Sequence, residues 1–386
     1  MPRRLYFLVI AYLTFIVISS DFAEAQEPDD QGFVSMFAGN DLSGWQRVNT
    51  DRRTWSIDAG VLKCTGKPIG ELRTAKMYQN FIMEIEWRHM VPKGNAGIFV
   101  WADDITAKGQ PFHRGIEVQV LENAYGQGKG YTTHGDIFPI HGATMKPING
   151  RGGSRAFPTE ERSNPSPQWN HYRIEAIDGD ISLAVNGKVV TRGTQCVPRK
   201  GYICIESEGG VVEYRNAKIK ELPSTELAPD MIAIADRGYR CLYTGIDLAG
   251  WQSQTADRWN ANDWILSYAG SPNSKQPLAT SETFDNYGFV FDVRLKENSG
   301  SLQVHLRGDA ATISIDPANE SLWNALAKPG QWNRIEGTIQ GNQIRLKVNN
   351  HAMEPVIIKD ASKTSGPLSL DPTGPVDFSN LYVRQM

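Results

Sequence analysis

Two stretches of the chain are nearly the same, and this repetition constrains the fold more than any other feature. The segment FAGNDLSGWQ at Phe37–Gln46 returns as YTGIDLAGWQ at Tyr243–Gln252. A second pair of segments begins with QWN, at Gln168 and at Gln331, and VEYRNAKIKEL is echoed by VDFSNLYVRQM at the C-terminus. Similarity of this kind indicates a duplicated domain, and 386 residues are enough for two.

The two copies differ in length. Trp45 and Trp169 are 124 positions apart, whereas Trp251 and Trp332 are 81 apart, a difference of 43. We expect these extra residues at about 105–155. Because the second copy lacks them, the fold does not require them, and they are candidates for a functional role. The predicted layout is a first domain over 33–222, a linker over 223–236, and a shorter accessory domain over 237–386. We expect the accessory domain to have no catalytic activity, because it lacks counterparts of His113, Glu117, His134 and His141.

Both halves are rich in short apolar runs, several of them alternating with polar residues, as in Phe81–Met90 and Gly115–Glu122. Asp178-Gly179 and Asn186-Gly187 are strong signals for tight hairpin turns. The pattern predicts an all-β protein made of two tandem β-sandwich or jelly-roll domains, the second smaller. Periodicity alone does not separate a jelly roll from an immunoglobulin-like sandwich.

The N-terminus predicts export. Arg3 and Arg4 precede a 14-residue apolar stretch that ends before Ala23-Glu24-Ala25, the pattern of a cleaved signal peptide over 1–25. The stretch is shorter than the roughly 20 residues of a membrane-spanning helix. We therefore expect a periplasmic or extracellular protein without a stable membrane span. The four cysteines fit either disulfides or buried free thiols.

The charge balance bears on the partner. With 40 basic and 43 acidic residues and a net charge of −3, the chain lacks the positive field that phosphate backbones require. Nucleic acid is therefore not an expected partner.

Several motifs together resemble the 3-keto-disaccharide hydrolase domain family, first described as a domain of unknown function. The resemblance covers residues 33–222 and rests on a set of segments in the order of the family: FVSMFAGNDLSGW, GNAGIFVWA, GIEVQVLE, HGDIFPIHG, QWNHYRI and GYICIESEGGVVEYRNAKIKEL. The second half is similar only at its ends. The resemblance implies a concanavalin-like jelly roll that acts on an oxidised sugar or glycoside.

The implied chemistry is cleavage of a glycoside already oxidised at C3. The ketone acidifies the C2 proton, so a base can remove it while the C1 substituent departs, and hydration completes a net hydrolysis. Such a site needs a base, a group that stabilises the enolate and an acid for the leaving group. We expect no cofactor and no nicotinamide. Binding of a divalent metal by His134 and His141 remains an alternative.

Three of the seven histidines, His113, His134 and His141, fall in the extra segment, and histidine transfers protons near neutral pH. In GIEVQVLE, alternation places Ile116, Val118 and Val120 toward the core and Glu117 and Gln119 on the opposite face. We predict Glu117 as the base, or as the group that orients His113 or His134. The alternative for each of these residues is a surface position without a catalytic role.

The same reasoning assigns substrate contacts to Arg114, Gln119, Asp136, His141 and Trp101, with Asp136 and His141 as the next candidates for proton transfer. Arg114 is suited to stabilising an enolate. Trp101 is suited to stacking on a sugar, but both faces of its strand are apolar, and the alternative is that its ring is buried in the core. The Gly- and Pro-rich stretch Asn123–Pro167 reads as a lid over the groove. A carbohydrate-binding or adhesion module without catalysis is the competing function.

Overall fold

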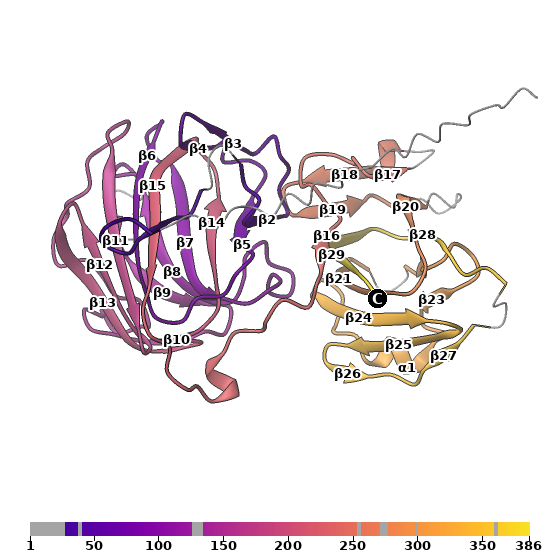
Figure 1. The fold of residues 1–386 in the computed structure, drawn as a ribbon. Helices are drawn as coiled ribbons and strands as arrows, with labels where there is room; N and C mark the ends of the chain where they lie inside the picture. Colours follow the sequence, from indigo (N-terminus) through magenta and orange to yellow (C-terminus); the bar gives the residue numbers. More distant parts are fainter. Residues whose placement is uncertain are drawn as a thin grey trace, which may run out of the picture.

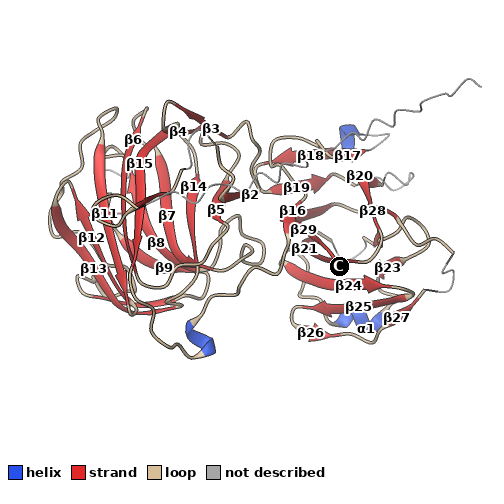
Figure 2. Cartoon of the chain, viewed as in Figure 1, coloured by secondary structure: helices blue, strands red, loops and turns tan. Residues whose placement is uncertain are grey.

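The chain forms two β-sandwiches that lie side by side (Figure 1), as seen in a computed structural model that describes residues 28–37, 41–125, 134–252, 256–270, 277–297, 300–358 and 362–386. Strands dominate both sandwiches (Figure 2), which confirms the predicted all-β architecture. The predicted signal peptide lies outside the described residues. Within the described ranges, no helix is long and apolar enough to cross a membrane.

The first sandwich consists of a nine-stranded and a six-stranded sheet. The larger sheet contains, in spatial order, β10 (Thr144–Pro147), β13 (Lys188–Val197), β12 (Asp180–Val185), β11 (Asn170–Ile177), β6 (Phe81–His89), β15 (Val212–Glu221), β4 (Val61–Cys64) and β3 (Trp55–Asp58), with β1 (Val34–Ser35) paired to β15. The smaller sheet has the order β2 (Trp45–Val48), β5 (Gly70–Thr74), β14 (Tyr202–Ser207), β7 (Asn95–Ala102), β8 (Gly115–Leu121) and β9 (Ile137–Ile140).

The second sandwich is built in the same way from a nine-stranded and a five-stranded sheet. The larger sheet contains β18 (Trp259–Asn262), β19 (Ile265–Tyr268), β29 (Val376–Gln385), β21 (Tyr287–Leu295), β24 (Asn333–Gln340), β25 (Gln343–Val348) and β26 (His351–Ala352), with β16 (Arg240–Cys241) on β29 and β27 (Val356–Ile357) on β25. The smaller has the order β17 (Trp251–Gln252), β20 (Leu278–Phe284), β28 (Gly366–Pro372), β22 (Leu302–His305) and β23 (Thr312–Ile315). Its helical turns are η2 (Ala256–Arg258) and α1 (Glu320–Asn324), and η1 (Pro229–Met231) lies between the sandwiches.

The strand orders of the two sandwiches correspond. In the second, β20, β28 and β22 occupy the places of β5, β14 and β7, and β23 occupies that of β8. The repeated tryptophans also make the same contact: Trp45 Nε1 donates to the Met36 carbonyl and Trp251 Nε1 to the Leu242 carbonyl. Among the described residues of the second sandwich, nothing corresponds to β9 and β10.

This correspondence corrects two expectations about the extra segment. The strand that carries Glu117 does have a counterpart, β23, whose sequence TISI contains no carboxylate. The stretch predicted to be a lid contains β9 and β10, which extend the two sheets of the first sandwich at their edges. The eight residues of β9 and β10 therefore form backbone hydrogen bonds within the sheets.

Strict alternation explains why these segments form sandwiches. Along β6, Phe81, Met83, Ile85 and Trp87 are fully buried, whereas the residues between them are half-buried. A period of two places one set of side chains on a single face of a strand. That face packs against the inner face of the six-stranded sheet and forms the core of the domain. The second sandwich has a separate core.

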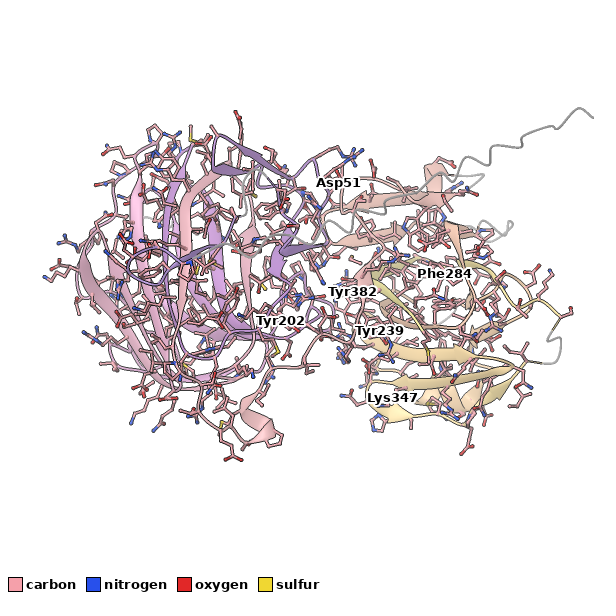
Figure 3. All side chains as sticks on the ribbon, viewed as in Figure 1. Asp51, Tyr202, Tyr239, Phe284, Lys347 and Tyr382 are labelled. Atoms are coloured by element: carbon pink, nitrogen blue, oxygen red, sulfur yellow. The ribbon has the colours of Figure 1, made fainter. Side chains whose placement is uncertain are left out.

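The two sandwiches are joined by contacts as well as by the linker. Val48 and Ile105 of the first pack against Val290 and Tyr382 of the second in a small apolar cluster, and Tyr382 lies at this junction in Figure 3. The residue that follows the linker is anchored too, since Arg237 makes a bidentate ion pair with Asp104 at 3.0 Å.

Asp292 is the centre of the polar part of this junction. Its fully buried carboxylate accepts hydrogen bonds from Arg334 Nε and Nη2, from Asn380 Nδ2 and from the backbone N–H of Gly109, at 2.7–2.8 Å. Gly109 is required there, because a Cβ would lie 2.3 Å from Trp332 Cδ1. The second sandwich thus holds residues 106–109, the segment that leads to His113 and β8.

Candidate active site

The outer face of the six-stranded sheet carries a group of buried polar residues. On β8, Ile116, Val118 and Val120 belong to the core, whereas Glu117 and Gln119 face outward. The neighbouring strands alternate in the same way and add Glu71 and Arg73 from β5, Gly97 and Phe99 from β7, and Cys204 and Glu206 from β14. Alternation in four adjacent strands therefore brings several carboxylates onto one surface.

Gly97 lies between two of these carboxylates. It is on β7, with β8 on one side and β14 on the other. A Cβ at this position would lie 2.9 Å from Glu117 Oε1 and 2.9 Å from Glu206 Oε2. Any larger residue would therefore displace one or both side chains, and glycine allows Glu117 and Glu206 to approach each other across the strand.

A pocket of about 200 Å³ opens on this face. It is lined by carboxylates, amides, one arginine and aromatic rings: Asn95, Phe112, Glu117, Gln119, Leu121, Tyr125, Phe138, Arg155, Glu206 and Glu208. Inside it, Gln119 Nε2 donates to Asn95 Oδ1 at 2.9 Å, and Asn95 Nδ2 donates to Glu208 Oε2. Apolar rings beside a few placed polar groups are typical of a small-molecule site.

Burial and crowding keep protons on the carboxylates of the pocket. Burial raises the pKa of Glu117 well above its usual value, and the negative charge of Glu208 raises it further. The pKa of Glu206 is raised by the same two causes. Burial raises the pKa of Glu208 to about 7, against the opposing effect of its bond to Asn95. Like charges in a desolvated site do not all ionise together, so this cluster holds both protonated and ionised carboxyls near neutral pH.

Among the described residues that line the pocket, Arg155 carries the positive charge. Its guanidinium lies 3.4 Å from the centroid of the Phe138 ring, and its Nη1 donates to Asp136 Oδ2 at 2.8 Å. Asp136 is fully buried behind it, and desolvation raises the pKa of this carboxyl to about 7 although Arg155 opposes the shift. The ion pair with buried Asp136 therefore holds the Arg155 side chain in place at the wall of the pocket.

Two of the predicted site residues, Glu117 and Gln119, line the pocket, and their predicted orientation away from the core is confirmed. Asp136 does not line the pocket, but it accepts a hydrogen bond from Arg155, which does. His113 is fully buried on the same face of the sheet, where its Nδ1 contacts Glu71 Oε2, but it is not part of the pocket lining.

Three other predicted residues lie elsewhere. His134 is buried and accepts a hydrogen bond from the Ser163 N–H at 3.3 Å, and burial lowers its pKa to about 4. His141 is exposed in the turn between β9 and β10. Arg114 makes a bidentate ion pair with Asp103, which also accepts the N–H of Ile234 in the linker. None of these three side chains is among the described residues that line the pocket.

Of the two interpretations of Trp101, burial in the core is correct and stacking on the substrate is not. The ring is fully buried in the core, where Nε1 donates to the Gln79 carbonyl and the ring packs edge-on against Phe81. The cause is an irregularity between β7 and β14, where Trp101 adopts a φ of 55°. This bulge turns the side chain inward, against the alternation of the strand.

Sequence reasoning missed Glu206, Asn95 and Arg155, which line the pocket. A signal for Glu206 existed, because alternation in YICIES places it on the same face as Tyr202 and Cys204. No comparable signal marked Arg155, which lies in the irregular segment between β10 and β11.

A larger hollow of about 700 Å³ lies beside the nine-stranded sheet of the first sandwich. Its carboxylates are already paired: Glu84 with Arg173 at 2.7 Å, and Glu86 with Arg215 at 2.7 Å. These ion pairs are half-exposed and occupy the charges, so the hollow is a less suitable place for proton transfer than the pocket on the six-stranded sheet.

The fold and the pocket define the first sandwich as a β-sandwich domain with a carboxylate-rich small-molecule site. Residues 32–220 match the family model of the 3-keto-alpha-glucoside-1,2-lyase-like domain. The first sandwich of this chain therefore belongs to that domain family, and this match supports a carbohydrate-active function. The comparison with curated proteins gave no match.

Solved structures with a similar fold include a candidate glycosyl hydrolase from Parabacteroides distasonis, which is 22% identical, with 50% of this chain and 95% of that chain covered and a TM-score of 0.40. The carbohydrate-binding module CBM66 from Bacillus subtilis is 11% identical, with coverage of 46% and 96% and a TM-score of 0.33. A β-glucanase from Bacillus licheniformis is 14% identical, with coverage of 50% and 97% and a TM-score of 0.32.

Proposed function

We propose that the first sandwich cleaves 3-keto-glycosides by β-elimination, with Glu117 and Glu208 as an acid–base pair. The observation that carries the proposal is this pair of carboxyls with raised pKa values in one pocket of a domain of the 3-keto-alpha-glucoside-1,2-lyase-like family. Perturbed carboxyls in a cleft are typical of acid–base sites.

In the proposed reaction the ionised carboxylate removes the proton from C2. The electron pair of that C–H bond forms a double bond between C1 and C2, and the C1–O bond breaks. The departing oxygen receives a proton from the protonated carboxyl. Addition of water, with oxygen to C1 and hydrogen to C2, then gives the free 3-keto sugar and completes a net hydrolysis.

Burial assigns the two roles. Glu117 is more deeply buried than Glu208 and therefore keeps its proton to higher pH. We infer that Glu117 donates the proton to the leaving oxygen and that Glu208 removes the C2 proton. This reverses the expectation from the sequence that Glu117 is the base. His113 and His134 have no part in the proposed step, because neither lines the pocket.

The other residues of the pocket bind and polarise the sugar. Arg155 is the cation that lines the pocket, and it is suited to stabilise the negative charge that develops on the C3 oxygen. Asn95 and Gln119 offer amide groups to the hydroxyls, and Phe112 and Phe138 offer rings to the apolar face of the sugar. A volume of about 200 Å³ limits the buried part of the substrate to a single sugar ring.

The experiment is an incubation of the purified protein with a 3-keto-disaccharide and, separately, with the unoxidised disaccharide. We expect a free sugar from the oxidised substrate only, and exchange of the C2 hydrogen with deuterium from the solvent. Saturable binding without release of sugar would show a binding module instead. Cleavage of both substrates without exchange at C2 would show an ordinary glycosidase. This is the second candidate function, because Glu117 and Glu206 approach each other across Gly97 and such enzymes use a pair of carboxylates.

A further inference from the structure

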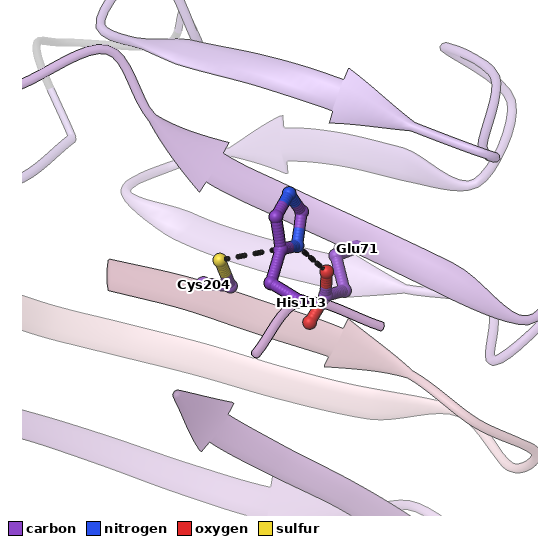
Figure 4. Close-up of side chains that lie close together, drawn as sticks. All are labelled: Glu71, His113 and Cys204. Carbon is purple, nitrogen blue, oxygen red and sulfur yellow. Dashed lines mark hydrogen bonds and ion pairs between the residues drawn. The ribbon is translucent and has the colours of Figure 1, made fainter. Parts of the chain in front are cut away.

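Glu71, His113 and Cys204 form a compact cluster beside the pocket (Figure 4). All three residues are fully buried, and one ligand atom from each lies within 4.8 Å of the others. They come from three separate segments: β5, the segment that precedes β8, and β14. None of the three lines the pocket.

Hydrogen bonds alone do not satisfy this cluster. His113 Nδ1 contacts Glu71 Oε2 and lies 3.7 Å from Cys204 Sγ. An imidazole nitrogen carries either one proton or one lone pair, so Nδ1 cannot donate to the carboxylate and accept from the thiol at once. Among the described residues, Glu71 Oε1 is also buried without a hydrogen-bond partner. Polar atoms left in this way are costly and point to a missing ligand.

A metal ion would bind one atom from each of the three side chains: His113 Nδ1, Cys204 Sγ and a carboxylate oxygen of Glu71. With Zn–N and Zn–S bonds of about 2.0 and 2.3 Å, a tetrahedral zinc places its nitrogen and sulfur ligands roughly 3.5 Å apart, close to the separation of Nδ1 and Sγ. A rotation of the Glu71 carboxylate would bring its unpartnered Oε1 toward the ion. Thiolate, imidazole and carboxylate together suit zinc better than calcium or magnesium, which prefer oxygen ligands only.

We propose that Glu71, His113 and Cys204 bind a zinc ion that ties β5 and β14 to the segment entering β8. Binding releases the thiol proton of Cys204, whose pKa burial otherwise raises well above its usual value. The three protein ligands leave one position for a water molecule. The site is separate from the acid–base pair, so zinc binding and cleavage of 3-keto-glycosides are independent claims.

The test uses cobalt(II) as a spectroscopic probe in the full-length protein after removal of bound metals with a chelator. We expect a thiolate-to-cobalt charge-transfer band on titration with cobalt chloride, and its loss when zinc chloride displaces cobalt. Loss of a residue that only hydrogen-bonds to a metal ligand typically lowers metal affinity by roughly 10- to 100-fold. Cys204→Ser should lack the band, and its zinc affinity should fall by more than this. Cys196→Ser is the matched control, because Cys196 is another buried free thiol, and it should keep the band.

Absence of the band in the wild type, or an equal band in Cys204→Ser, would overturn the proposal. If Cys204→Ser does not fold, X-ray absorption of the zinc-loaded wild type decides the question. One sulfur neighbour with nitrogen and oxygen neighbours supports the site, whereas a shell of nitrogen and oxygen alone refutes it. Neither measurement depends on turnover, so failure here leaves the proposed reaction standing.

Discussion

Replacing Glu208 with Gln should stabilise the protein at pH 8 and leave its stability unchanged near pH 4.5. The pKa of Glu208 is raised from 4.5 to about 7 in the folded state, so the folded protein holds this proton more tightly than the unfolded chain. As the pH rises from about 4.5 to 7, the unfolded state releases the proton first, and the free energy of unfolding falls. The wild type therefore loses stability in this window, and the variant does not.

The size of the effect follows from the pKa shift. One pKa unit corresponds to about 1.4 kcal/mol, so the shift of Glu208 is worth at most about 3 kcal/mol. The side chain is partly exposed, and solvent screening reduces the expected gain to about 1–2 kcal/mol. Gln keeps an oxygen that accepts from Asn95, so the hydrogen bond to this residue survives.

The assay is urea unfolding followed by tryptophan fluorescence at pH 4.5 and pH 8. Glu226→Gln is the control, because Glu226 is exposed in the linker, and it should change the free energy of unfolding by less than about 0.5 kcal/mol at either pH. A Glu208→Gln variant that is no more stable than the wild type at pH 8 would refute the argument that burial destabilises the ionised form of Glu208.

Three further substitutions test other parts of the structure. Gly97→Ala should stay folded but lower turnover of a 3-keto-glycoside by about 10- to 100-fold, because its Cβ would displace Glu117 and Glu206; Gly44→Ala, with open space around it, should match the wild type, and equal activity of the two variants would contradict the geometry. Asp292→Ala should lower the free energy of unfolding by about 3–5 kcal/mol, since it leaves the buried charge of Arg334 unpaired, whereas loss of the exposed ion pair in Glu282→Ala should cost less than about 1 kcal/mol. His134→Ala should lower the melting temperature but leave the pH profile of turnover unchanged, because a histidine with a pKa of about 4 is neutral throughout the working range; a displaced profile would return His134 to the mechanism.

The sequence predicts the fold well because sandwiches depend on local alternation. The period of two in β6 and β8 correctly places Trp87 in the core and Glu117 outside it. The length difference between the repeated segments also points to the region that contains β9 and β10. These features are visible from neighbours in the chain alone.

The composition of the pocket is less predictable because it depends on which strands are adjacent. Glu117 and Glu206 are 89 positions apart in the chain, and only the order β14, β7, β8 brings them to either side of Gly97. The histidines were favoured because they cluster in the sequence, yet His113, His134 and His141 have three different environments. The error at Trp101 has another origin, a bulge that reverses the alternation of β7.

The most direct test of the account is the turnover of a 3-keto-glycoside by Glu117→Gln. Gln preserves the shape of the side chain but cannot transfer a proton, and loss of a positioned acid typically lowers the rate by about 10² to 10⁴. We expect this loss together with a melting temperature at or above that of the wild type, because the substitution removes a desolvated carboxyl. A folded Glu117→Gln protein that turns over the substrate within about threefold of the wild-type rate would contradict the proposed role of Glu117 in proton transfer.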